Sequence, residues 1–143
     1  MGVVYRAEDI RLERRVALKF LAPHLVSEEA PKRFEREAKS VAALDHPNIC
    51  TVYEIDEAEG TLFLAMGFVE GQTVRERIAY RPLKLEEALD IAAQTAEGLR
   101  AAHQRGIVHQ DIKPANVVIN VHGQVKIMDF GSARVADATI TRG

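Results

Sequence analysis

The segment from Lys84 to Gly106, KLEEALDIAAQTAEGLRAAHQRG, predicts one long helix, because its apolar residues recur at helical spacing and a glycine ends it. The apolar stripe of this helix is formed by Leu85, Leu89, Ala92, Ala96 and Leu99, with Ile91 beside it. Burying one large apolar side chain is worth roughly 1.5–3 kcal/mol, so an uncovered stripe is comparable with the whole stability of a domain. A chain that contains this helix must therefore cover it with other elements or with a partner surface.

Strand-like segments dominate the first half of the chain. Four segments rich in β-branched and aromatic residues predict strands, namely GVVYRAED, RRVALKFL, ICTVYEI and TLFLAMGFV. The first two form a predicted hairpin, and the last two flank the polar turn DEAEG. The period of two in RRVALKFL places Ala17 and Lys19 on one face, so Lys19 shares its face with a small side chain.

A second helix is predicted between these strands, from Ser27 to Leu44. Its apolar stripe includes Phe34 and Val41, and Glu37 falls within or beside that stripe. The segment HPNI ends the helix, because proline cannot continue it. After the strands, VEGQTV is the best candidate for a hinge and TVRERIA predicts a short helix. Strands and helices are thus partly segregated, as in the α+β class.

Length, charge and cysteine content exclude several classes of protein. A chain of 143 residues normally makes one domain. A net charge of -2 gives no electrostatic reason to expect nucleic acid or an anionic membrane as a partner. Cys50 is the only cysteine, which excludes an intrachain disulfide and suits a reducing, cytoplasmic location. No apolar run in the sequence is long enough to predict a signal peptide or a membrane span.

The last predicted hairpin places oxygen ligands together. NVVINV and QVKIMDF flank a tight turn at His122-Gly123, and a symmetric fold about that turn sets Asn116 opposite Asp129. Two hard oxygen ligands of this kind suit Mg²⁺, and Asp111 just upstream could accept a hydroxyl proton. Asn and Asp are also common turn formers at strand ends, so each residue alone has a purely structural interpretation.

The combination of motifs resembles the signature of protein kinases. HQDIKPAN at residues 109–116, followed by DFG and preceded far upstream by VALK, has the order found in that family. More closely, the chain resembles bacterial serine/threonine protein kinases of the eukaryotic-like type. The resemblance implies a two-lobe α+β fold in partial form. Residues 1–66 would form the N-lobe, 67–72 the hinge and 73–143 the start of the helical C-lobe.

The resemblance also implies roles for individual residues. Asp111 would be the catalytic base, and Lys113 would neutralise the γ-phosphate during transfer. Lys19 would hold the α- and β-phosphates of ATP and pair with Glu37. The Mg²⁺ ligands would be Asn116 and Asp129. The remaining ATP-binding residues would be Gly2, Val4, Ala17, Met66, Gly67, Val69 and Val118, with Met66 as the gatekeeper and the backbones of Gly67 and Val69 on the adenine edge.

Two further expectations concern packing. By the same resemblance, Phe130, His109, Val41 and Val52 would form a stacked apolar column, an interpretation that nearly coincides with ordinary core packing. Cys50 is expected to be a small buried hydrophobe, because the sequence places no base beside it.

The sequence departs from the family pattern in three places. Of the family's GxGxxGxV loop only Gly2 and Val4 are matched, which implies weakened ATP binding. The family's HRD reads His109-Gln110-Asp111, which implies weakened control by loop phosphorylation. The final GSARVADATITRG matches the start of an activation loop, and no APE follows it. We therefore expect a kinase fragment, shortened at both ends, with impaired activity of its own.

Three functions compete on the sequence alone. The first is a serine/threonine protein kinase that uses Mg-ATP, and Lys113 favours Ser/Thr substrates by resemblance. The second is a non-catalytic, kinase-like module that binds a partner protein through the open face of the long helix; retention of Lys19, Asp111, Asn116 and Asp129 argues against it. The third, a small-molecule phosphotransferase of related fold, is disfavoured by Lys113 and by the residues that follow Asp129.

Overall fold

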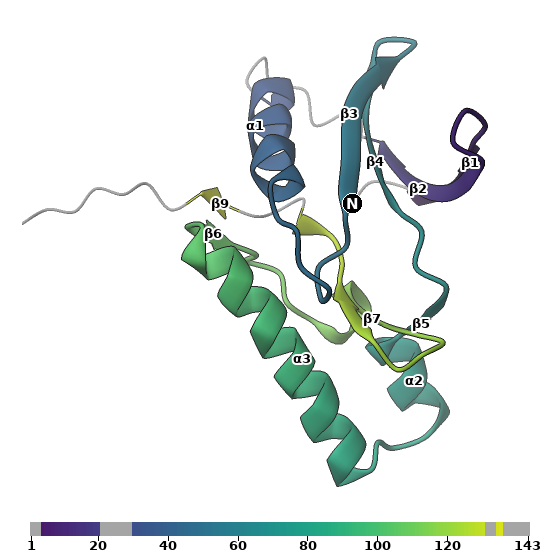
Figure 1. Cartoon of the computed structure of the whole chain (residues 1–143), viewed down its shortest axis with the longest axis vertical. Helices are drawn as coiled ribbons and strands as arrows, with labels where there is room; N and C mark the ends of the chain where they lie inside the picture. The colour runs from purple at the N-terminus through teal and green to yellow at the C-terminus, as the bar shows by residue number, and fades with distance from the viewer. Residues whose placement is uncertain (1–3, 21–29, 131–133, 136–143) are drawn as a thin grey trace, which may run out of the picture.

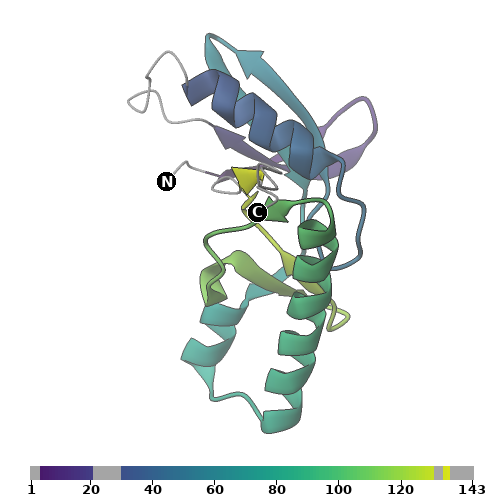
Figure 2. The same cartoon turned by 90° about the vertical axis from the view of Figure 1, so that its left-hand side faces the viewer.

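The computed structural model describes residues 4–20, 30–130 and 134–135, and it has two lobes stacked along the long axis (Figure 1). One lobe is an antiparallel sheet with a helix on one face, and the other is mainly helical. Figure 2 shows α1 lying across the sheet and α2 and α3 running through the second lobe. The two-lobe α+β architecture expected from the sequence is confirmed.

The sheet lobe contains four strands in the order β1-β2-β4-β3. They are β1 (Val4–Asp9), β2 (Arg14–Phe20), β3 (Val52–Ala58) and β4 (Thr61–Gly67). Ala17 pairs with Met66 and Lys19 with Leu64, so these four side chains share one face. The β3–β4 turn is shorter than the predicted DEAEG, because Glu59 and Gly60, both with positive φ, close a two-residue loop.

Helix α1 (Ala30–Ala42) packs against β3. Ala38 and Val41 are buried and Phe34 is partly buried, as the predicted stripe requires. The helix ends before Leu44, two residues earlier than predicted. Pro47 disfavours helical backbone at the residue before it, and the chain instead makes turns at residues 43 and 47–48 before Ile49 pairs with Ile127. The predicted start at Ser27 lies outside the described residues.

The second lobe begins with three elements that follow one another closely. They are β5 (Gly71–Thr73), α2 (Val74–Tyr80) and α3 (Leu85–Gln104). Both predicted helices are confirmed, and α3 stops before Gly106, whose φ of 70° suits glycine. Sequence reasoning missed β5. It pairs with β7 so closely that a Cβ on Gly71 would lie 2.1 Å from Ile119 O, so only glycine fits there.

Four short elements complete the lobe around the HQDIKPAN loop. They are β6 (Ile107–Val108), the 3₁₀ helix η2 (Pro114–Asn116), β7 (Val117–Asn120) and β8 (Val125–Ile127). Further on, the two-residue strand β9 (Arg134–Val135) pairs with β6. Neither β6 nor β9 was predicted, since strands of two residues carry no periodic signal.

The predicted register of the β7–β8 hairpin is wrong by one residue. Val118 pairs with Lys126, and Met128 N donates to Asn116 O at 2.8 Å, so Asn116 lies level with Met128 and not with Asp129. The loop has three residues, because Asn120 N donates to Gln124 O. A three-residue loop with glycine at positive φ is a common hairpin closure, and it shifts the pairing by one residue.

The predicted apolar stripe of α3 is also wrong in part. Leu85 is 74% exposed and Leu89 61% exposed, and Ala92 and Ala96 are exposed as well. The face that packs on the rest of the lobe contains smaller or polar residues, including the buried Gly98 and Ala102. A Cβ on Gly98 would lie 2.8 Å from the Ile127 side chain and 3.0 Å from Asn48 O. This close approach selects the small face of α3 for burial.

The main core lies where the two lobes meet. Its buried members are Val41, Leu44, Ile49, Ala102, Ile107, Ile127 and Phe130. The loop after α1 joins the hairpin directly, since Cys50 N donates to Ile127 O at 2.9 Å and Ile127 N donates to Asn48 O at 2.8 Å. The sheet lobe and the β7–β8 hairpin are thus tied together by backbone hydrogen bonds beside the candidate site.

Candidate functional site

The HQDIKPAN loop folds around the Asp111 carboxylate. Lys113 Nζ donates to Asp111 Oδ2 at 2.7 Å, and Asn116 Nδ2 donates to the same oxygen at 3.2 Å. Asn116 Nδ2 also donates to Asp111 O at 2.9 Å. The hydrogen bond from Lys113 lowers the pKa of the Asp111 carboxyl, so this group is a carboxylate at neutral pH. Three of the predicted site residues therefore form one hydrogen-bonded group.

Asn116 is oriented by this group. Its Nδ2 hydrogens are directed at Asp111, and its residue is 8% exposed. Within the part of the chain that the structure describes, no donor is bonded to Asn116 Oδ1. An amide oxygen without a donor is a suitable ligand for a hard cation such as Mg²⁺.

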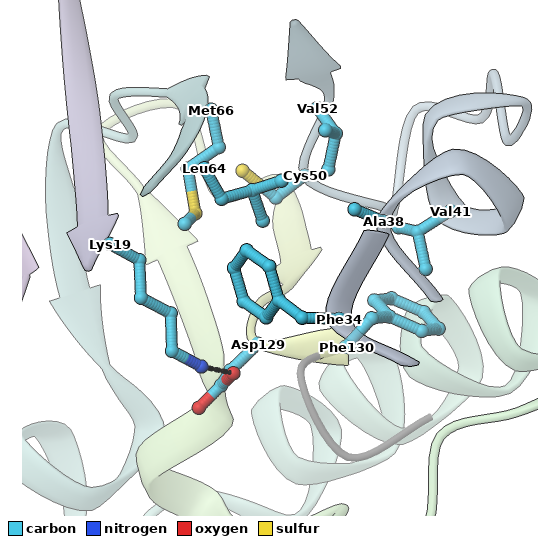
Figure 3. Close-up of a pocket in the computed structure, with 10 residues that line it drawn as sticks. All are labelled: Lys19, Phe34, Ala38, Val41, Cys50, Val52, Leu64, Met66, Asp129 and Phe130. Atoms are coloured by element: carbon cyan, nitrogen blue, oxygen red, sulfur yellow. Dashed lines mark hydrogen bonds and ion pairs between the residues drawn. The ribbon is translucent and has the colours of Figure 1, made fainter. Parts of the chain in front are cut away.

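Asp129 lies at the end of the hairpin and contacts the sheet lobe. Its backbone has a φ of 56°, an unusual value for a residue other than glycine. Lys19 Nζ from β2 forms an ion pair with Asp129 Oδ1 across the space between the lobes (Figure 3). The Lys19 side chain is only 15% exposed, and that of Asp129 is 35% exposed. Residues 110 positions apart in sequence are thus brought together.

The carboxylate of Asp129 and the oxygens of the catalytic-loop group could hold a divalent cation. The register correction sets Asp129 one residue beyond the position opposite Asn116, but both still lie at the open end of the same hairpin. Asp111 adds a third oxygen-rich side chain near that end. The donor set consists of carboxylate and amide oxygens, which is the chemistry Mg²⁺ prefers.

An apolar pocket lies directly behind Lys19 and Asp129 (Figure 3). Its lining residues are Lys19, Phe34, Ala38, Val41, Cys50, Val52, Leu64, Met66, Asp129 and Phe130. The Phe34 side chain projects from α1 into the pocket (Figure 3). The pocket therefore has an apolar wall from both the sheet and α1, with one cation and one carboxylate at its mouth.

Only some of the residues predicted to contact adenine lie together in the structure. Ala17 and Met66 are buried in one cluster, and Val69 packs against it. Val118 lies on β7, where it pairs with Thr73 and Lys126, whereas Val4 on β1 is 55% exposed. Gly2 and the side chain of Glu37 lie outside the described residues.

Two backbone groups at the predicted hinge already form hydrogen bonds within the chain. Gly67 N donates to Thr51 O at 2.8 Å, and the Cys50 thiol donates to Gly67 O at 3.3 Å. The carbonyl has a second lone pair, so it can still accept a hydrogen bond from a ligand.

Sequence reasoning missed three residues of the site. Phe34 and Leu64 line the pocket, and Met128 packs against the cluster that contains Ala17 and Met66. Strand pairing between β2 and β4 could have indicated Leu64, since it lies opposite Lys19. Phe34 was recognised only as part of a helix stripe.

His109 links the catalytic loop to β8. Its Nδ1 accepts from Asp111 N at 3.2 Å, so its Nε2 carries the hydrogen and donates to Met128 O at 2.8 Å. The ring is 1% exposed and meets Phe130 edge to face at 4.5 Å between centroids. Phe130 shares a core cluster with Val41, and Val52 packs against that cluster. The expected column of four side chains is therefore present.

Two other residues near the site have notable environments. Gln110 has a φ of 67°, so two residues near the site, Gln110 in the HQDIKPAN loop and Asp129 after β8, adopt the left-handed region. Cys50 is buried as expected, and burial raises the pKa of its thiol to about 11. A thiol with this pKa is protonated at neutral pH and packs as an apolar side chain.

Comparison with known proteins identifies the class. The family model of the protein kinase domain matches residues 1–141, and the chain belongs to this family.

Among curated proteins, the serine/threonine-protein kinase PrkC of Bacillus subtilis is 44% identical over 141 residues. The kinases named PknB are 43% identical over 146 residues in Mycobacterium leprae and 41% over 145 residues in Mycobacterium tuberculosis. These alignments include 97%, 97% and 96% of this chain but only 22%, 24% and 23% of the respective relatives. The chain thus spans about a quarter of their length. Among the described residues no helix is both long and apolar enough to cross a membrane.

Proposed function

We propose that this chain is the nucleotide-binding and catalytic part of a serine/threonine protein kinase, which transfers the γ-phosphate of ATP to hydroxyl groups of proteins. The observation that carries the proposal is the joining of Lys19 to Asp129 across the lobes, beside the Asp111–Lys113–Asn116 group. It is supported by the serine/threonine kinases among the relatives.

The side chains have separate tasks in this proposal. Asp111, a carboxylate whose pKa is lowered by the hydrogen bond from Lys113, accepts the proton of the substrate hydroxyl. Lys113 lies 2.7 Å from that carboxylate and supplies positive charge to the transferred phosphate. Lys19 supplies positive charge on the opposite side, from the sheet lobe. The two ammonium groups thus flank the place where negative charge develops.

Mg²⁺ and ATP fit the donor set described above. Asn116 and Asp129 would hold Mg²⁺, which when bound neutralises phosphate charge and orients the phosphates for transfer. Ala17, Met66 and the backbones of Gly67 and Val69 would receive the adenine, with Val118 and Val4 on either side and Gly2 near the phosphates. Glu37 on α1 would take over Lys19 when Asp129 binds the metal.

The test is transfer of labelled γ-phosphate to the chain itself and to a test protein, followed by identification of the phosphorylated amino acid. Phosphoserine and phosphothreonine are expected, with no signal from Asp111→Asn. Phosphotyrosine, or equal signal from Asp111→Asn, would contradict the proposal. For the 143-residue chain assayed by itself we expect slow transfer, because the leucines on the open face of α3 favour association over a single folded state.

The same open face favours a second candidate, a non-catalytic module that binds a partner protein through Leu85 and Leu89. In that case Mg-ATP would neither stabilise the chain against heat nor be consumed, whereas Leu85→Glu with Leu89→Glu would abolish partner binding. A Mg-ATP thermal shift that depends on Lys19 would instead favour the kinase.

A further inference from the structure

One side chain in the middle of α3 uses its full hydrogen-bonding capacity. Gln94 Oε1 accepts from Asn48 Nδ2 at 3.0 Å and from Val125 N at 2.8 Å. Gln94 Nε2 donates to Asp90 Oδ2 at 2.9 Å and to Gly123 O at 3.1 Å. A primary amide has two lone pairs and two hydrogens, so all four positions are filled. This residue therefore connects α3, the loop after α1 and the β7–β8 hairpin.

The partners of Gln94 are also bonded to each other. Asn48 Nδ2 donates to Val125 O at 2.9 Å, and Asn48 O accepts from Ile127 N at 2.8 Å. Asn48 is 8% exposed, while Val125 and Ile127 are fully buried. The hydrogen bond from Asn48 Nδ2 to Val125 O is buried and is costly to lose, because the freed groups cannot reach water. The network therefore ties Gln94 to a buried part of the chain.

Both ends of this network lead to the candidate site. Strand β8 continues through Met128 to Asp129, which carries the carboxylate paired with Lys19. The loop after α1 continues from Asn48 to Cys50, which packs beside Met66 in the pocket. Gln94 itself is not among the residues that line the pocket.

We propose that Gln94 is a positioning residue that fixes the end of β8 bearing Asp129 relative to the loop after α1. By fixing the position of Asp129, Gln94 sets the affinity of the site for Mg-ATP. The statement about affinity rests on the proposed function, but the statement about position does not.

Three variants separate hydrogen bonding from simple packing. Gln94→Met keeps a similar volume and removes all four hydrogen bonds. Gln94→Glu keeps the two acceptor positions but sets its other carboxylate oxygen against Asp90 Oδ2 and Gly123 O. Adding Asp90→Asn to Gln94→Glu removes that repulsion, because the new amide can donate to the new carboxylate. Glu97→Gln, an exposed change on the same helix, is the matched control.

Two measurements on the full chain are needed. Hydrogen–deuterium exchange of residues 44–52 and 117–129 reports on position, and the dissociation constant for Mg-ATP reports on the site. In Gln94→Met we expect faster exchange in both segments and a dissociation constant raised about tenfold, which corresponds to the loss of about one net hydrogen bond. The double variant should regain part of the affinity lost in Gln94→Glu, because the contact with position 90 is restored while that with Gly123 O is not, and Glu97→Gln should change nothing.

The proposal is overturned if exchange in the two segments stays native in Gln94→Met, or if only one segment responds. It is also overturned if Gln94→Glu behaves the same with and without Asp90→Asn. Should Gln94→Met not fold, the Gln94→Glu pair decides alone. If the native chain binds no Mg-ATP, the proposed function fails, and the exchange data still decide whether Gln94 positions β8.

Discussion

The two walls of the candidate site are held in place differently. The wall from the helical lobe is built from hydrogen bonds, with His109, Asp111 and Asn116 each bonded to groups within the loop or on β8. The wall from the sheet lobe is built from strand pairing and apolar packing. Lys19 extends from this wall across the space between the lobes and pairs with Asp129. The side chains proposed to act in transfer and to hold Mg²⁺ are thus positioned within one lobe, whereas the Lys19–Asp129 pair depends on how the two lobes meet.

The largest effect on the transfer rate is expected from a change in the helical wall. Asp111→Asn leaves the loop geometry similar but removes the proton acceptor, so the transfer rate should fall by about 10²- to 10⁴-fold. Binding of Mg-ATP, measured by calorimetry, should stay unchanged. A large loss of affinity in this variant would mean that Asp111 also takes part in binding Mg-ATP and does not act in transfer alone.

A change in the sheet wall should instead lower the affinity for Mg-ATP. Lys19→Ala removes a partly buried charge that pairs with Asp129, and the affinity for Mg-ATP should fall about 10- to 100-fold, the value of a hydrogen bond to a charged group. Lys39→Ala is the control, because Lys39 is 72% exposed and pairs only with Glu35 on the same helix within the described residues. Equal effects of the two substitutions would contradict the role of Lys19.

A smaller change tests the charge balance inside the helical wall. Lys113→Met removes the hydrogen bond that lowers the pKa of Asp111, so this pKa should rise toward the ordinary value of about 3.9. Because the pKa is lower in the folded chain than in the unfolded chain, the native group stabilises the fold above pH about 4. That contribution is lost as pH falls through the lowered value. A carboxyl carbon titration by NMR that is identical in both proteins would refute the assignment.

The smallest effect concerns the pocket behind the sheet wall. Since the pKa of Cys50 is about 11, only about one thiol in a thousand is ionised at pH 8. Alkylation should therefore be about 100-fold slower than for an exposed cysteine. The rate should rise to the ordinary value when the chain is unfolded in denaturant, as followed by mass spectrometry. Fast alkylation of the folded chain would show that the pocket is open and the thiol ionised.

Much of the site could be predicted from the sequence, because its residues lie in segments with clear patterns. The alternation in β2 correctly placed Lys19 beside Ala17 on the inner face, and the HQDIKPAN motif located Asp111 and Asn116. The pairing of Lys19 with Asp129 was not foreseen, since it depends on how far apart the two lobes lie. Local periodicity contains no information on that distance.

The failures have identifiable physical causes. The hairpin register was wrong because Gly123 closes a three-residue loop where a two-residue turn was assumed. The buried face of α3 was wrong because close approach at Gly98 matters more than the apolar character of Leu85 and Leu89. The role of Gln94 could not be predicted, because a half-buried amide in a helix looks like a surface residue in sequence.

The metal–nucleotide site is tested most directly by calorimetric titration with ATP in the presence and absence of Mg²⁺. The native chain and the Asp129→Asn variant are titrated in parallel. We predict binding of one ATP that is strongly enhanced by Mg²⁺ in the native chain and an enhancement that is largely lost in Asp129→Asn. Equal affinity with and without Mg²⁺, or full enhancement in Asp129→Asn, would contradict the claim that Asp129 and Asn116 form a metal–nucleotide site with Lys19.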